Sequence, residues 1–180
     1  HAVITRSSGA GYTFYLNGIF DGNTAPGSPP NTNSRSAYIG ARESNLGGLT
    51  SYFNGKIDEV RFYHRSLSAD EVSQLYRLTT PTGTDTSLKG YWSFNGKDVS
   101  GTTAYDRSGA GNNGTLTNGP TKTIGKIGQA LNFDGSDDYV NAGSGSSLDG
   151  MSAMTLSAWI YPESMGESSK GRIFDKAAAN

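Results

Sequence analysis

Short runs of alternating apolar and polar residues recur along most of the chain, separated by residues that favour turns. The longest regular run extends from Met154 to Tyr161. Its apolar face comprises Met154, Leu156, Ala158 and Ile160. Because successive side chains of a strand point to opposite faces, Trp159 and Tyr161 would share the face away from the core. This alternation is typical of a strand with one buried face.

Turn signals bound several of the shorter runs. Asn17-Gly18 lies between two apolar segments and predicts a hairpin, because both central residues of a type I′ turn need positive φ. Asn54-Gly55 is interpreted in the same way, as a turn before a strand over residues 56–64. Residues 21–36 are rich in Gly, Pro, Asn and Ser and are expected to form an exposed loop.

One short helix is predicted after residue 67. Ser68 is a favourable N-cap, and Glu71 completes a capping box three residues later. The helix should end near residues 76–78, and residues 79–86, which are apolar only at proline, read as a linker. Many short strands with glycine-containing turns and one short helix predict an all-β sandwich.

Composition narrows the function classes. The net charge is -1, and no long run of Lys or Arg occurs, so nucleic acid is not an expected partner. No apolar run approaches the roughly 20 residues of a membrane span, so membrane insertion is not expected. The chain has no Cys, which excludes a disulfide framework. Because it starts at His1 without Met or a signal peptide, we expect it to be a piece of a longer protein.

Several motifs resemble one known family. Residues 55–63, followed by 65–72, resemble the closing strand and helix of laminin-G-like modules, which belong to the concanavalin A-like lectin/glucanase superfamily. Residues 88–94 resemble the opening strand of the same modules, as do the motifs within residues 104–116 and 128–140. The resemblance implies an antiparallel jelly-roll β-sandwich.

The order of these motifs departs from the family pattern, because the closing motif comes first. We therefore assign residues 1–78 to the C-terminal half of a module, 79–86 to a linker and 87–180 to an N-terminal half. The chain is either the junction of two tandem modules or a circular permutant. We expect the two halves to complete one sandwich, within one chain or by strand exchange with a neighbouring copy or module, since half a sandwich leaves open edges.

The resemblance also implies a structural calcium ion. Related modules often hold Ca²⁺ with a Gly/Asn-rich loop and the acidic start of the closing strand, which points to Asp106, Asn112 or Asn113, and Asp58. Carboxylate, amide and carbonyl oxygens are ligands that suit Ca²⁺. The alternative is an Asx-turn without an ion. The acidic pair Asp137-Asp138 is expected to be solvated.

Aromatic residues are the candidate ligand-binding groups. An exposed ring can stack on the apolar face of a sugar while polar neighbours bond its hydroxyl groups. The candidates are Trp159, Tyr161 and Tyr52, each of which could instead pack inside the sandwich.

Catalysis is not expected. A glycosidase needs a pair of carboxylates at a defined separation, and none of the five Glu residues lies in such a pattern. Asp58 and Glu59 are adjacent, which would place them on opposite faces of a strand. We expect a non-catalytic carbohydrate-binding or adhesion module of a secreted or surface-attached, multimodular microbial protein. The alternative is a structural spacer or assembly repeat, and a glycoside hydrolase is a weaker third hypothesis.

Overall fold

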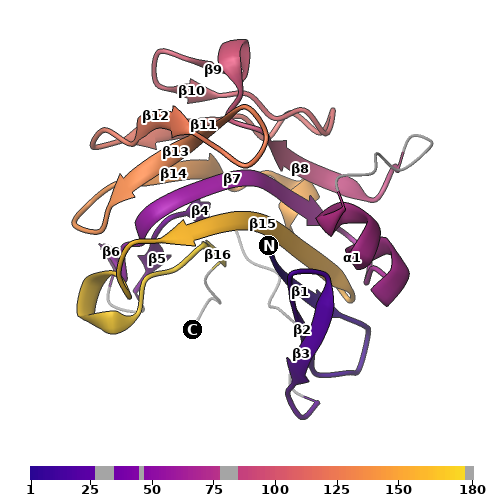
Figure 1. The fold of residues 1–180 in the computed structure, drawn as a ribbon. Helices are drawn as coiled ribbons and strands as arrows, with labels where there is room; N and C mark the ends of the chain where they lie inside the picture. The colour runs from indigo at the N-terminus through magenta and orange to yellow at the C-terminus, as the bar shows by residue number, and fades with distance from the viewer. Residues whose placement is uncertain (27–34, 45–46, 78–84, 177–180) are drawn as a thin grey trace.

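The computed structural model describes residues 1–26, 35–44, 47–77 and 85–176. These residues form two antiparallel β-sheets packed face to face, with one α-helix at one end (Figure 1). The expected all-β jelly-roll sandwich is confirmed. No helix within these ranges has the length and apolar character needed to cross a membrane.

The larger sheet contains eight strands. Its strands in spatial order are β12 (Thr121–Ile124), β13 (Gln129–Asp134), β7 (Asn54–Tyr63), β15 (Met154–Pro162), β1 (Ala2–Arg6), β2 (Tyr12–Leu16) and β3 (Ile19–Asn23), while β8 (Leu88–Trp92) also pairs with β7. Because β13 and β8 pair with different parts of β7, three strands are anchored on this one long strand.

The smaller sheet faces it. Its six strands are, in order, β16 (Phe174–Lys176), β4 (Ala37–Ile39), β14 (Tyr139–Gly143), β11 (Gly114–Thr117), β10 (Thr103–Ala104) and β9 (Val99–Ser100). A separate short ladder joins β5 (Arg42–Glu43) to β6 (Leu49–Thr50). Single 3₁₀ turns occur at Gly96–Asp98, Ser146–Leu148 and Glu167–Ser169.

Each main sheet mixes strands from the two ends of the sequence. In the larger sheet β7 lies between β13 and β15, and in the smaller sheet β4 lies between β14 and β16. Within the described residues, neither main sheet is therefore built from one end of the sequence alone. The division into two half-modules stays a prediction, and residues 79–84 of the expected linker lie outside the described residues.

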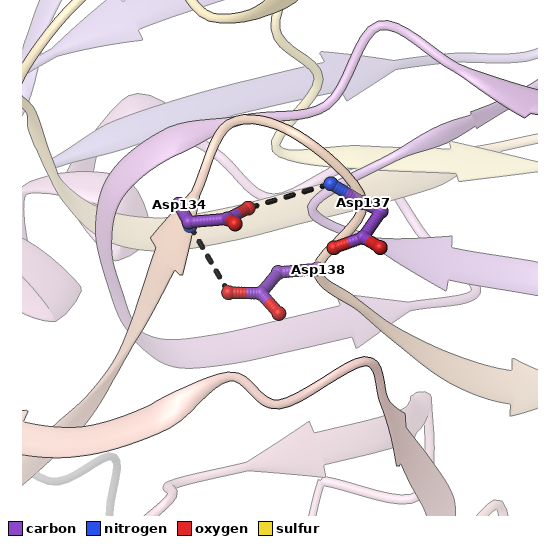
Figure 2. Close-up of side chains that lie close together, drawn as sticks. All are labelled: Asp134, Asp137 and Asp138. Atoms are coloured by element: carbon purple, nitrogen blue, oxygen red, sulfur yellow. Dashed lines mark hydrogen bonds between the residues drawn. The ribbon is translucent and has the colours of Figure 1, made fainter.

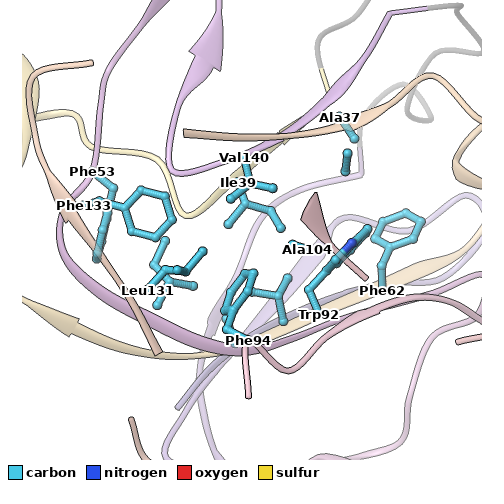
Figure 3. Packing of buried hydrophobic residues seen from close by; sticks show 14 of the residues in the cluster. Ala37, Ile39, Phe53, Phe62, Trp92, Phe94, Ala104, Leu131, Phe133 and Val140 are labelled. Carbon is cyan, nitrogen blue, oxygen red and sulfur yellow. The ribbon is translucent and has the colours of Figure 1, made fainter. Parts of the chain in front are cut away.

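The main core lies between the two sheets (Figure 3). Phe62, Leu131 and Phe133 of the larger sheet pack with Ile39 and Val140 of the smaller one, and all are buried. The core also includes Trp92, whose indole Nε1 donates a hydrogen bond of 2.9 Å to the carbonyl oxygen of Asn112. The bond satisfies the polar atom of a fully buried side chain, as burial requires.

The helix α1 (Ala69–Tyr76) packs on the outer face of the larger sheet. Its predicted capping box is present, since Ser68 accepts from the Glu71 N–H and Glu71 accepts from the Ser68 N–H. Val72 and Leu75 pack with Tyr63 in a second apolar cluster. Because Phe62 belongs to the main core and Tyr63 to this cluster, the two cores lie on opposite faces of β7.

The two Asn-Gly predictions have different outcomes. Asn17 and Gly18 have φ values of 51° and 79° and join β2 to β3, which confirms the predicted hairpin turn. Asn54 and Gly55 lie inside β7, so the predicted turn is wrong there. Gly55 instead allows the backbone of β15 to approach β7 closely, because a Cβ at Gly55 would lie 2.3 Å from the carbonyl oxygen of Tyr161.

The end of β3 and the start of β16 set two further element boundaries. The loop expected over residues 21–36 begins later, because β3 continues to Asn23, and residues 27–34 lie outside the described residues. The last strand, β16, begins only at Phe174, since the N–H of Gly171 donates to Met165 in the loop after β15 and the N–H of Arg172 donates to Ser51 in the loop ahead of β7.

Replacing Gly55 should destabilise the fold through this contact. Gly55→Ala places a methyl group against backbone at a φ of 128° and should lower the free energy of unfolding by about 2 kcal/mol or more. The matched control is Gly22→Ala on β3, where a Cβ meets nothing within 4 Å, with an expected change below about 1 kcal/mol. Urea unfolding followed by circular dichroism measures both, and equal effects would contradict the packing argument.

Candidate functional site

A cleft of about 260 Å³ opens on the outer face of the larger sheet. Strands β7 and β15 form its base, and the turn that joins β12 to β13 forms one wall. The lining side chains that matter most for its chemistry are Lys56, Asp58, Lys126, Ala130, Trp159 and Tyr161. The cleft thus combines aromatic, cationic and anionic groups on one sheet face.

Strand pairing explains why these residues meet. Asp58 lies directly opposite Trp159, and Lys56 lies directly opposite Tyr161, on the antiparallel pair β7–β15. Ile57, between Asp58 and Lys56, belongs to the main core, so its two neighbours must face outward. Side chains paired in this way have Cβ atoms about 5 Å apart. Two residues expected as ligand contacts, and one expected as a metal ligand, therefore share one site.

A β-bulge shapes β7 beside the cleft. Ser157 is opposite Arg61 while Trp159 is opposite Asp58, so β7 has one more residue than β15 between the two pairs. Glu59 lies in this bulge with a φ of 55°, a left-handed conformation that is unusual for a residue other than glycine. The bulge thus interrupts the regular alternation of β7 one residue beyond Asp58.

The expected opposite facing of Asp58 and Glu59 is therefore wrong. The carboxylate of Glu59 accepts from the hydroxyl group of Tyr91, at 2.8 Å, and from Arg61. Tyr91 precedes the core residue Trp92 on its strand and so faces outward. Both acidic groups consequently lie on the outer face, but Glu59 is buried in its own network and does not line the cleft.

Asp58 is the buried carboxylate of the cleft. Its Oδ2 accepts backbone hydrogen bonds from Lys126, at 2.7 Å, and Ile127, at 2.9 Å, which ties β7 to the β12–β13 turn. Its Oδ1 is buried and has no hydrogen-bond partner within the described protein. Burial, with a smaller contribution from the negative charge of Glu59, raises the pKa of Asp58 to about 6.

Trp159 lines the cleft but is not an exposed platform. Only 9% of its surface is accessible, because its ring stacks on Tyr76 at 5.5 Å between centroids and contacts the His1 ring at 4.9 Å. The ammonium group of Lys126 lies 4.9 Å from its ring centroid. Its Nε1 is buried without a hydrogen-bond partner in the described protein. The residue thus lines the cleft without offering it a free ring face.

Tyr161 is the exposed aromatic ring of the cleft, with 65% of its surface accessible. Tyr52, the third expected aromatic, lies in the loop before β7 and does not line the cleft. It is half-buried, and its backbone exchanges hydrogen bonds with Glu167. Of the three expected aromatics, Tyr161 alone has the exposure that stacking requires.

The residues expected to bind calcium belong to separate networks. Both carboxylate oxygens of Asp106 are occupied: Oδ1 accepts from the N–H groups of Tyr91 and Ser108, and Oδ2 accepts from the Ser108 hydroxyl and the Asn112 N–H. The bond from Ser108 N–H closes an Asx-turn. These four donors use the acceptor positions of a carboxylate, so this arrangement does not fit a calcium ion at Asp106.

The other three residues expected to bind calcium also form hydrogen bonds within the protein. The side-chain amide of Asn112 donates to the carbonyl oxygen of Lys89 and the hydroxyl group of Ser147, each at 2.7 Å. The side-chain oxygen of Asn113 accepts from the N–H of Asp106 at 3.0 Å. Asp58 is bonded to the β12–β13 turn instead. All four residues therefore stabilise loops by hydrogen bonds.

A second acidic group lies at the turn between β13 and β14 (Figure 2). Asp134, Asp137 and Asp138 have carboxylate oxygens within 4.8 Å of one another. Asp134 accepts from the N–H groups of Ser136 and Asp137, and its own N–H donates to Asp138. The cluster closes the turn. Asp137 is exposed, as expected, but Asp138 is buried, so the expectation that it is solvated is wrong.

Sequence reasoning missed the two lysines of the cleft. Lys56 and Asp58 are two residues apart on a strand, which indicates a shared face but not what covers it. Lys126 comes from a separate Gly-Lys-Ile-Gly turn. Only the pairing of β13 with β7 brings that turn to the cleft.

The raised pKa of Asp58 has a consequence for stability. Between about pH 4 and pH 6 the folded protein binds more protons at Asp58 than the unfolded chain does, so the stability contributed by this residue falls as pH rises. Asp58→Asn keeps an oxygen acceptor but does not titrate. Its free energy of unfolding relative to the native protein should therefore increase from pH 4 to pH 7, by up to about 3 kcal/mol.

Urea unfolding at several pH values measures this difference. Asp134→Asn is the control of opposite sign, because backbone hydrogen bonds, first that of Ser136, lower the pKa of the native carboxyl group. The free energy of unfolding of Asp134→Asn relative to the native protein should therefore rise as pH falls. A constant difference between Asp58→Asn and the native protein at every pH would contradict the burial of a titrating carboxylate.

One comparison with known proteins finds a match. Residues 1–73 match a family model described as the concanavalin A-like lectin/glucanases superfamily. A search of curated proteins and a search of solved structures found no match. The matched residues include β7 and its bulge, and the strands that complete their sheets come from residues 85–176. Residues 1–73 therefore match the concanavalin A-like lectin/glucanases superfamily, and the sandwich fold of the described residues agrees with a laminin-G-like jelly-roll module.

Proposed function

We propose that this module binds carbohydrate, without catalysis, in the cleft formed by β7, β15 and the β12–β13 turn. The superfamily often binds carbohydrates, which supports the ligand class. The secreted or surface location expected from the resemblance, within a multimodular protein, belongs to the same proposal.

The observation that carries the proposal is the position of Tyr161 beside two unsatisfied polar atoms. A sugar ring can stack on the exposed Tyr161 ring, since its C–H face is apolar. Oδ1 of Asp58 and Nε1 of Trp159, on two residues that line the cleft, are an acceptor and a donor without a hydrogen-bond partner in the described protein, and both are buried in the unliganded fold. Leaving such buried atoms unpaired costs about 1–3 kcal/mol each, so a ligand that reaches them gains affinity.

The carboxylates of β7 favour binding over hydrolysis. Glycosidases place an acid and a second carboxylate on the two sides of a scissile bond. Here Asp58 is in the cleft, but Glu59 is held by Arg61 and Tyr91 outside it. The cleft thus offers one carboxylate to a ligand, which supports the non-catalytic proposal.

Calcium stabilisation stays a prediction from the resemblance. The saturated carboxylate of Asp106 favours the alternative in which hydrogen bonds alone close the loop. Thermal unfolding with calcium and with EDTA separates the two, because a ligand that binds the folded state raises the melting temperature.

An assembly role is the second candidate function, favoured by the β2–β3 hairpin. Leu16, Ile19 and Phe20 are each about half or more exposed at the end of the larger sheet. Exposed apolar residues beside an edge strand are typical of contacts between chains. A concentration-dependent dimer without glycan binding would favour this role over carbohydrate recognition.

Removing the exposed ring should abolish carbohydrate binding. For any glycan that binds the native module, Tyr161→Ala should weaken the affinity at least about tenfold, because stacking is lost while the fold is kept. The control is Tyr105→Ala, another exposed tyrosine that does not line the cleft. A glycan array followed by calorimetry makes the measurement, and equal affinity of the two variants would reject the cleft.

A further inference from the structure

Two ammonium groups flank the cleft without a carboxylate partner. Lys56 comes from β7 and Lys126 from the β12–β13 turn, so they reach the cleft from different elements. Among the described residues, no salt bridge engages either of them. Surface lysines elsewhere are also often unpaired, but these two converge on a single recess that holds an exposed ring.

The charge of the cleft is opposite to that of the chain. Its charged lining residues are Lys56, Lys126 and Asp58, a balance of one positive charge at neutral pH, whereas the whole chain has a net charge of -1. Asp58 pairs with neither ammonium group, because its Oδ2 is bonded to backbone N–H groups and its Oδ1 has no partner, so one positive charge remains in excess. The local field therefore favours an anion in the cleft.

Each ammonium group is held by a weak contact that it can leave. Nζ of Lys126 lies 4.9 Å from the Trp159 ring centroid, and Nζ of Lys56 lies 5.6 Å from that of Tyr161. Cation–π contacts of this kind are weak beside a direct ion pair. A carboxylate or sulfate group forms a stronger, charge-assisted hydrogen bond. An anionic ligand can thus draw Lys56 off the tyrosine and free that ring for stacking.

The geometry of the strands couples the two interactions. Lys56 is the residue directly opposite Tyr161, so a sugar ring stacked on the tyrosine lies next to the lysine. Lys126 lies beside Asp58, because its backbone N–H donates to Oδ2 of that residue. A single sugar unit with an acidic substituent can therefore meet the exposed ring and an ammonium group together.

We propose that the ligand of this cleft is an acidic carbohydrate, with Lys56 and Lys126 binding its anionic groups. This inference rests on the proposed carbohydrate binding at the same site and specifies its ligand class. A neutral sugar would use only the ring and the polar atoms. An acidic one also uses both lysines and gains affinity at low ionic strength.

Matched oligosaccharides test the inference by calorimetry. The probes are a tetrasaccharide of galacturonic acid, its methyl ester as the uncharged counterpart, and a sulfated heparin-derived tetrasaccharide. The native module should bind at least one of the two anionic probes about tenfold or more tighter than the ester at 50 mM salt, and the preference should shrink at 500 mM. Which anionic probe is preferred distinguishes carboxylate from sulfate.

Variants separate this inference from the proposed function. Lys56→Gln with Lys126→Gln should remove the anionic preference, so that the affinity for the anionic probes falls to that for the ester, while Tyr161→Ala should weaken binding of every probe. The control pair, Lys97→Gln with Lys170→Gln, removes the same charge at exposed positions outside the cleft and should keep the preference.

Three outcomes would overturn the inference. Equal affinity for the ester and both anionic probes rejects an acidic ligand while leaving carbohydrate binding intact. An anionic preference that survives the loss of both cleft lysines, or that the control pair also loses, rejects the assigned residues. Binding of all probes that does not change in Tyr161→Ala instead rejects the proposed function itself.

Discussion

Strand β7 is hydrogen-bonded to β15 along one edge and to β13 and β8 along the other, so its position fixes those of all three neighbours. These neighbours come from the second half of the sequence, and β7 comes from the first. Its inward residues build the main core, and its outward residues build the cleft. The backbone pairing of this one strand thus links the closure of the sandwich to the formation of the site.

The bulge at Glu59 adds a cost in free energy to the role of β7 in both the core and the cleft. It places two adjacent carboxylates on the outer face, where burial raises the pKa of both Asp58 and Glu59. Glu59 is compensated by Arg61 and the hydroxyl group of Tyr91. Asp58 is compensated on one oxygen only, by the N–H groups of the β12–β13 turn. Strained backbone and an incompletely bonded buried acid are features that folded proteins usually keep for binding.

Local sequence signals predicted the local structure well. Ser68 and Glu71 predicted the helix cap, and Asn17-Gly18 predicted the hairpin, because the required φ values and hydrogen bonds are set by neighbouring residues. Asn54-Gly55 led to a wrong turn prediction, since its role depends on the approach of β15, which is distant in sequence. The same limit applies to the site: alternation gave the outward face of Trp159 and Tyr161, but the burial of Trp159 by Tyr76 and the arrival of Lys126 are tertiary effects.

The chain contains two tryptophans, of which Trp159 lines the cleft and Trp92, in the core, can serve as an internal reference. Nε1 of Trp159 is unpaired beside the cleft, whereas Nε1 of Trp92 is bonded to Asn112 in the core. Nuclear magnetic resonance of both indole groups during titration with the galacturonic acid tetrasaccharide tests the account most directly. We predict that the Trp159 resonance shifts to saturation while the Trp92 resonance stays in place. A bound tetrasaccharide that leaves the Trp159 resonance unmoved, or moves both equally, would contradict ligand recognition in this cleft.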